Sequence, residues 1–225
     1  MAAINANSNV REVAAVTADH PTGEAIHAST HAPDLAAIAA YGGNEQGTGA
    51  ALYAEKRGDK GHAGFFNGDV YVTRNLGVGG DLIVMGGDVA EEFELAEGID
   101  EVSAGAVLVL DEQGTLAPCT RAYDRCVAGI VAGAGDRVPA LILDRRSAEQ
   151  DVGQKRAVSI IGKAWCWADA SSRPICVGDL LTTSENPGHG MVAEDRDLAF
   201  GAVLGKALTP LPSKTGLVLA LVGLA

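Results

Sequence analysis

The sequence has few aromatic and few basic residues, and each shortage argues against a class of protein. Only 4% of the 225 residues are aromatic, whereas 29 are glycines. This composition favours closely approaching backbones over a thick aromatic core. Lys and Arg number 17 against 29 Asp and Glu, a net charge of −12. Binding to phosphate groups needs clustered Lys and Arg. The composition therefore argues against sequence-independent binding to nucleic acid and against binding to an anionic membrane surface.

Targeting and membrane-spanning segments are also missing from the sequence. The N-terminal stretch "MAAINANSNV" lacks the basic region followed by an apolar region that defines a secretory signal. The apolar run at residues 216–225 is too short to span a bilayer. We therefore expect a chain made in the cytoplasm without a signal peptide or membrane insertion, which reaches a virion or an extracellular particle by assembly.

Common catalytic and metal-binding motifs are absent. There is no GxSxG, GxxxxGK[ST] or HExxH pattern, and no CxxC pair. We expect no cofactor and no metal site, although one histidine per chain becomes three around a trimer axis. The cysteines are expected to be buried free thiols, with a disulfide between two that flank a hairpin, Cys166 and Cys176, as the alternative. The other two cysteines are Cys119 and Cys126.

The first third of the chain carries a loose repeat. Short apolar islands lie at residues 12–15, 25–28, 37–40, 51–54 and 63–66, separated by Gly, Asn, Asp and Pro. This spacing of 12 to 14 residues predicts a β-rich stalk over residues 1–66. A short helix within residues 32–43, capped by Asp34 and closed by Gly42, is the alternative there.

Residues 67–84 repeat every six residues, as NGDVYV, TRNLGV and GGDLIV. The fourth and sixth places of each hexad fall on one face of an extended strand. Three hexads in one chain bury too little to stand alone, so they predict a β-helical collar over residues 67–87 in a homotrimer. An antiparallel meander within a monomer is the alternative. The residues at the fourth and sixth places are Val70, Val72, Leu76, Val78, Leu82 and Val84.

Residues 88–225 are predicted to form a compact β domain, which makes the whole protein all-β. Residues 137–144, 157–169 and 216–224 read as strands. Similar apolar segments begin at Gly105 and Gly178, and each returns as a small apolar strand near Gly129 or Gly201. This similarity predicts an internal duplication.

An acidic segment, "GGDVAEEFELAEG" at residues 86–98, follows the hexads. Carboxylates crowded in this way can raise one another's pKa and support proton transfer, although a solvated linker is the simpler interpretation. Together with "GDVYVTRNLGVGGDL", "VLVLDEQGTL" and "YDRCVAGIVAG", the segment resembles the C-terminal region of phage appendage and tail-spike proteins. These end in an autocleaving intramolecular-chaperone domain of the peptidase G2 type. The resemblance covers about residues 65 to 145.

The resemblance implies a trimeric β architecture and places the family's cleavage motif at residues 87–91. Asp88 and Glu91 match the acidic residues that assist cleavage, but Gly87 stands where the family has serine. Hydroxyl-assisted scission of the backbone needs a side-chain oxygen, which glycine lacks. The resemblance therefore implies the trimer-forming role, but it does not by itself imply self-cleavage.

A second candidate site is the polar loop within residues 177–192. Loops on a strand hairpin often carry binding groups, so a sugar or small-ligand site is one interpretation, and a tight turn that closes the hairpin is the other. The candidate binding residues are Ser184, Glu185, Asn186 and His189.

These observations predict a non-enzymatic structural component of a fibre or spike in a phage or phage-derived particle. Its expected partners are two further copies of the chain, other particle proteins and a cell-surface receptor or glycan. One alternative is an autoproteolytic chaperone that cleaves after Gly87. The other is a monomeric β domain that binds a sugar or another small ligand.

Overall fold

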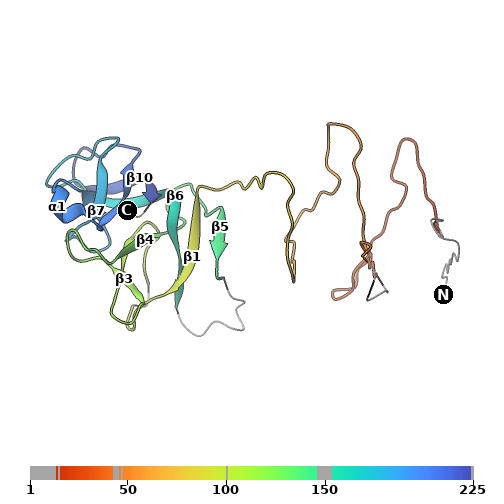
Figure 1. Ribbon diagram of the computed structural model, residues 1–225, viewed down its shortest axis with the longest axis horizontal. Helices are drawn as coiled ribbons and strands as arrows, with labels where there is room; N and C mark the ends of the chain where they lie inside the picture. The colour runs from red at the N-terminus through yellow and green to blue at the C-terminus, as the bar shows by residue number, and fades with distance from the viewer. Residues whose placement is uncertain are drawn as a thin grey trace. The chain divides into compact units, whose positions relative to one another are not determined.

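The computed structural model describes residues 14, 16–42, 46, 48–99, 101–145 and 154–223. The chain divides into two units, Met1–Leu76 and Gly77–Ala225. In the described part of the first unit, no residue belongs to a helix or strand, and every residue except Ala32 is exposed. The described strands and the one described helix all lie in the second unit (Figure 1).

Five strands of the second unit close into a barrel. In the order of their pairing they are β6 (Lys155–Asp169), β8 (Gly190–Val192), β7 (Leu180–Thr183), β9 (Val203–Ala207) and β10 (Thr215–Gly223). The circle closes because β10 pairs antiparallel with β6 over nine residue pairs. A single turn of helix, α1 (Arg196–Ala199), connects β8 to β9, and its N-terminus is capped by the Asp195 carboxylate.

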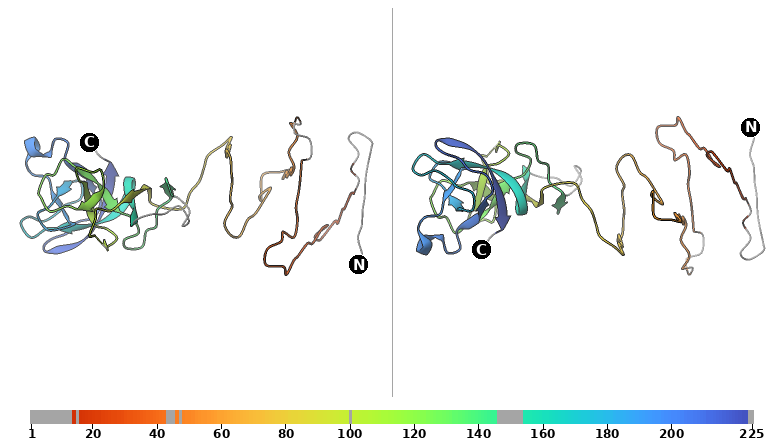
Figure 2. Two further views of the ribbon diagram at one scale, coloured as in Figure 1. Left: turned by 90° about the horizontal axis from the view of Figure 1, so that it is seen from below. Right: turned by 90° about the horizontal axis from the view of Figure 1, so that it is seen from above.

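The remaining strands extend the sheet from the first half of β6. They are β1 (Asp88–Glu94), β2 (Val107–Leu110), β3 (Leu116–Pro118), β4 (Val127–Val131) and β5 (Leu141–Leu143). β4, β2 and β3 follow β6 in that order, while β1 pairs antiparallel with β6 and parallel with β5. The 15-residue β6 therefore belongs to both the barrel and this extension, and Figure 2 shows the strands from two further sides.

Two clusters of small and branched apolar side chains form the core. One fills the barrel, where Ala164, Cys166 and Ala168 of β6 point inward and meet residues such as Leu204 and Val218. The other joins buried residues of β2, β3, β4 and β6, with Phe93 of β1 packed against it. None of the fully buried members of either cluster is aromatic, in keeping with the composition. Burial of each larger aliphatic side chain contributes about 1.5–3 kcal/mol to folding.

The predicted all-β fold is confirmed for the described residues. The strands expected within residues 137–144, 157–169 and 216–224 appear as β5, β6 and β10. Each of the two similar segments forms an antiparallel unit of three strands, with its first strand, β2 or β7, in the middle. An origin by duplication stays a prediction.

The predictions for residues 1–87 are a β-rich stalk over residues 1–66 and a hexad collar over residues 67–87, both in a trimer. Part of the expected stalk, including residues 1–13, lies outside the described residues. The described residues before Asp88 contain no strand, so the meander within a monomer does not form, and residues 32–42 contain no helix. A single chain offers no second copy to pair with, and the trimeric stalk and collar therefore stay predictions. Across the described ranges, no helix has the length and apolar character that crossing a membrane requires.

Candidate functional site

The first residue of β1 is a buried carboxylate. Asp88 is 5% exposed and accepts a hydrogen bond from the hydroxyl of Ser159, a fully buried residue of β6. Burial raises the pKa of Asp88, while the Ser159 hydrogen bond and the positive charge of Arg137 act in the opposite direction. An acid with these surroundings holds its proton more tightly than a surface aspartate does.

The backbone just before Asp88 passes tightly against β6. The Gly87 amide donates to the carbonyl of Val138 at 3.3 Å, and the Lys163 amide donates to the carbonyl of Gly87 at 2.7 Å. A Cβ atom on Gly87 would lie 2.6 Å from the Lys163 carbonyl oxygen. On the other side of this contact Gly162 has a φ of +109°, and its Cβ would lie 2.7 Å from the Gly87 oxygen. The family's serine therefore has no room at this position unless the backbone shifts.

Glu91, the second predicted catalytic residue, faces other surroundings. It lines a groove of about 290 Å³ whose lining includes Glu92, Glu94 and Lys155. Asp88 does not line this groove, and within the described residues no hydrogen bond joins Asp88 to Glu91. A part for the two carboxylates in cleavage stays a prediction.

The buried Asp88 predicts a pH-dependent contribution to stability. Its pKa is higher in the folded than in the unfolded state, so its contribution is full below the unfolded value and is lost as pH rises through the folded value. Asp88→Asn removes this titration. We expect the free energy of unfolding of the wild type, relative to that of the variant, to fall as pH rises from acid to neutral.

The measurement is urea unfolding of both proteins at a series of pH values. Asp111→Asn is the matched control, because hydrogen bonds from Thr115 lower the pKa of Asp111 and the trend should have the opposite sign. A difference between wild type and Asp88→Asn that does not change with pH would contradict this prediction.

The predicted polar loop is a tightly hydrogen-bonded connection between β7 and β8. The Ser184 amide donates to the His189 carbonyl at 2.9 Å, and the Ser184 hydroxyl accepts from the Asn186 amide at 3.1 Å. The Asn186 side chain donates to Asp169 at 3.2 Å. Ser184, Glu185 and Asn186 line one pocket of about 330 Å³, whereas His189 lines another. The structure thus divides the four predicted binding residues between two pockets.

The pocket that His189 lines was not predicted as a site. It measures about 430 Å³, and the Trp167 and His189 ring centroids lie 6.1 Å apart with their planes inclined by 51°. On β6 the inward Cys166 leaves Trp165 and Trp167 on the outer surface. The alternation in "WCW" is the sequence signal that could have identified this face. We call the cavity the Trp167 pocket, and its main lining residues are Glu101, Ser103, Pro118, Trp167, Pro187 and His189.

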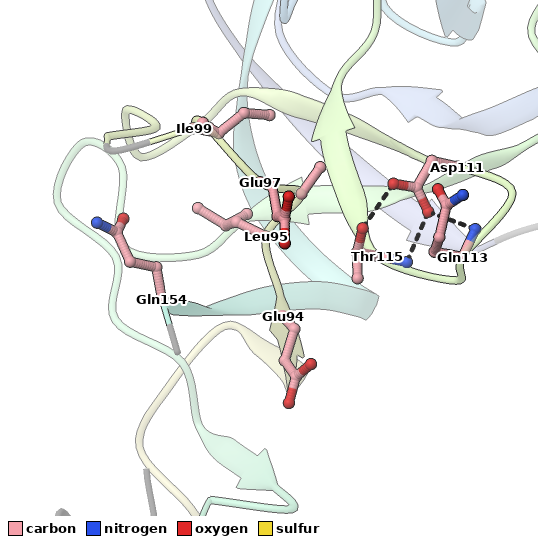
Figure 3. A pocket seen from close by; sticks show the side chains of 10 residues that line it. Glu94, Leu95, Glu97, Ile99, Asp111, Gln113, Thr115 and Gln154 are labelled. Atoms are coloured by element: carbon pink, nitrogen blue, oxygen red, sulfur yellow. Dashed lines mark hydrogen bonds between the residues drawn. The ribbon is translucent and has the colours of Figure 1, made fainter. Parts of the chain in front are cut away.

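A further hollow, of about 780 Å³, is acidic and lies near the end of β1 (Figure 3). Glu94 and Glu97 line it together with Asp111, which accepts hydrogen bonds from the Thr115 hydroxyl at 2.6 Å and amide at 2.8 Å. The Asp111 carboxylate is thus already hydrogen-bonded within its own turn. Among the described residues, no group of three or more His, Cys, Asp or Glu is arranged to hold a metal ion.

The four cysteines are free in the structure. Cys119 and Cys166 are buried, whereas Cys126 and Cys176 are exposed. Burial raises the pKa of Cys166 to about 12, which leaves its thiol protonated and unreactive at neutral pH. The expected buried free thiol is confirmed for Cys119 and Cys166 and is wrong for Cys126 and Cys176, which are free but exposed. The alternative disulfide between Cys166 and Cys176 is not formed.

No protein-family model matches the sequence, and no curated protein matches it. Among solved structures, the chain is similar to the crystal structure of the bacteriophage phi29 gene product 12 C-terminal fragment. The TM-score is 0.40 at 12% identity, and the alignment covers 60% of this chain and 99% of that chain. A similarity of this extent carries no argument about function. The resemblance to the peptidase G2 type stays a prediction.

Proposed function

We propose that the chain is a non-enzymatic structural component of a fibre or spike in a phage or phage-derived particle, and that it works as a homotrimer. One observation carries the proposal: every described residue from 14 to 85 except Ala32 is exposed in the single chain, including the large apolar ones. The phage setting is supported by the resemblance of the acidic motif and its flanking segments.

The exposed apolar residues of this segment are regularly placed, which random surface residues are not. At the fourth place of the three hexads stand Val70, Leu76 and Leu82, each more than half exposed. Burial of apolar surface is worth about 25 cal/mol per Å², so a chain of this pattern gains stability when neighbours cover the apolar face. Three copies around one axis would supply those neighbours at every hexad.

The C-terminal domain has an apolar surface that suits the same assembly. Val89 of β1 pairs with Leu141 of β5 on one side and with Ile161 of β6 on the other. Residues paired in this way point to the same face of a sheet, and Leu141 and Ile161 are 44% and 59% exposed. This row begins two residues after the predicted collar, so contacts between copies would continue from the collar onto the domain.

The test is native mass spectrometry of the full-length protein, followed by the denatured mass of the same sample. We expect a native mass of three times 22.9 kDa and chains of full length. A monomer at micromolar concentration would overturn the proposed trimer, and would leave the ligand-binding β domain as the better description.

A further inference from the structure

We propose that the Trp167 pocket binds an uncharged or amino-substituted saccharide. The inference rests on the proposed function and deepens it, because it names the chemical class of the cell-surface partner that a fibre or spike would bind. It follows from three properties of the pocket: a fixed aromatic surface, hydrogen-bond acceptors on its rim, and a lining without cationic side chains.

The aromatic surface is held in place by the barrel. Cys166 and Ala168 point into the core, so Trp167 between them points outward. Its backbone amide donates to the Gly105 carbonyl at 2.8 Å, and its indole Nε1 donates to the Ala104 carbonyl at 3.0 Å. Because the indole N–H is already satisfied, the ring contributes only its apolar surface to the pocket. A rigid indole of this kind suits stacking against the C–H face of a pyranose ring.

The acceptors suit sugar hydroxyls. The Nδ1 atom of His189 lies 2.8 Å from the Pro187 carbonyl oxygen. A carbonyl can only accept, so Nδ1 carries the proton, and in the neutral ring Nε2 is left as an acceptor. The Glu101 carboxylate adds two acceptor oxygens, and the Ser103 hydroxyl can either donate or accept. Ring stacking and acceptor groups therefore meet in one pocket.

The charge of the lining selects among saccharides. No Lys or Arg is among the residues that line the pocket, whereas Glu101 is. A phosphorylated or sialylated glycan would place its negative charge beside this carboxylate without a counter-charge, which is unfavourable. An uncharged sugar meets no such repulsion, and an amino sugar gains an ion pair. The volume of about 430 Å³ lies within the range of about 300–1,000 Å³ typical of small-molecule sites.

The outward-facing indole of Trp167 would also suit a proline-rich peptide, because such peptides bind in aromatic-lined grooves. Such peptides present mainly carbonyl acceptors, because proline has no N–H. Both His189 Nε2 and Glu101 are acceptors too, so their hydrogen bonds would stay unmade. The acceptor set therefore favours a ligand rich in hydroxyl donors.

The test is a fluorescence titration of the full-length Trp165→Phe variant, in which Trp167 is the remaining one of two tryptophans. The probes are galactose, glucosamine and N-acetylglucosamine, with sialic acid and a proline-rich decapeptide for comparison. We expect a saturable change with at least one of the first three probes in the millimolar range. No response to these three, or a stronger response to sialic acid or to the peptide, would overturn the inference.

Two further variants assign the response to this pocket. His189→Phe and Glu101→Gln should each weaken binding by about tenfold or more. Glu112→Gln, a matched change at an exposed residue that does not line the pocket, should leave binding unchanged. Equal affinity in all three variants would overturn the inference. Native mass spectrometry measures the oligomeric state independently of sugar binding. Trimers that bind no sugar would contradict only this inference. Monomers that bind sugar would contradict only the proposed trimer.

Discussion

Replacing both Val78 and Leu82 by aspartate is expected to convert trimers into monomers. Both residues lie on the apolar face of the hexads, which the proposed trimer buries around its axis. Each chain would bring two carboxylates into this interface, where leaving a charge unpaired costs on the order of several kcal/mol. Like charges from three copies would also repel one another. Native mass spectrometry should show the loss directly, with the single-chain mass replacing the trimer mass.

The control for this variant is Thr73→Asp together with Asn75→Asp. It adds the same two charges to the same segment, but at the first and third places of a hexad, on the opposite face of the extended strand. We expect the control to remain trimeric. Trimers that persist with aspartate at both 78 and 82 would show that the hexads do not form the interface.

Replacing Gly87 by serine, the residue that the peptidase G2 type has at this place, is expected to destabilise the C-terminal domain without producing cleavage. The new Cβ would lie 2.6 Å from the Lys163 carbonyl oxygen, which is backbone and cannot turn aside as a flexible side chain can. Overpacking of this kind costs about 1–3 kcal/mol. Cleavage is not expected, because the shifted backbone would disturb the hydrogen bonds that Gly87 makes with Val138 and Lys163.

Urea unfolding measures the loss of stability, and denatured mass spectrometry detects cleavage. Gly49→Ser is the control, since a Cβ atom at that position meets nothing within 4 Å, and it should unfold like the wild type. A fragment of residues 88–225 released from the Gly87→Ser variant would contradict the prediction. It would also show that Asp88 and Glu91 can support cleavage once a hydroxyl is present.

The buried Asp88 and the glycine contact before it restrict how the chain enters the β domain. Asp88 accepts from Ser159, and the Ala140 amide donates to the Asp88 carbonyl at 2.8 Å. The first residue of β1 is thus held by segments on both sides.

The strands of the β domain could be predicted because their signal is local. Alternation of inward and outward residues with a period of two is visible in residues 157–169 and again in 216–224, and turn-forming residues interrupt such runs. The same alternation could also have placed Trp165 and Trp167 on one face of their strand. It could not say what covers that face, since Glu101 and Pro187 come from segments that are distant in the sequence.

The barrel and the sites were decided by tertiary structure. Closure depends on β10 returning to β6, and the burial of Asp88 depends on Ser159, 71 residues further along the chain. The separation of His189 from Ser184 into different pockets likewise follows from which strands flank their hairpin. A local pattern specifies which residues face the same way, but only the pairing of distant strands specifies what each face meets.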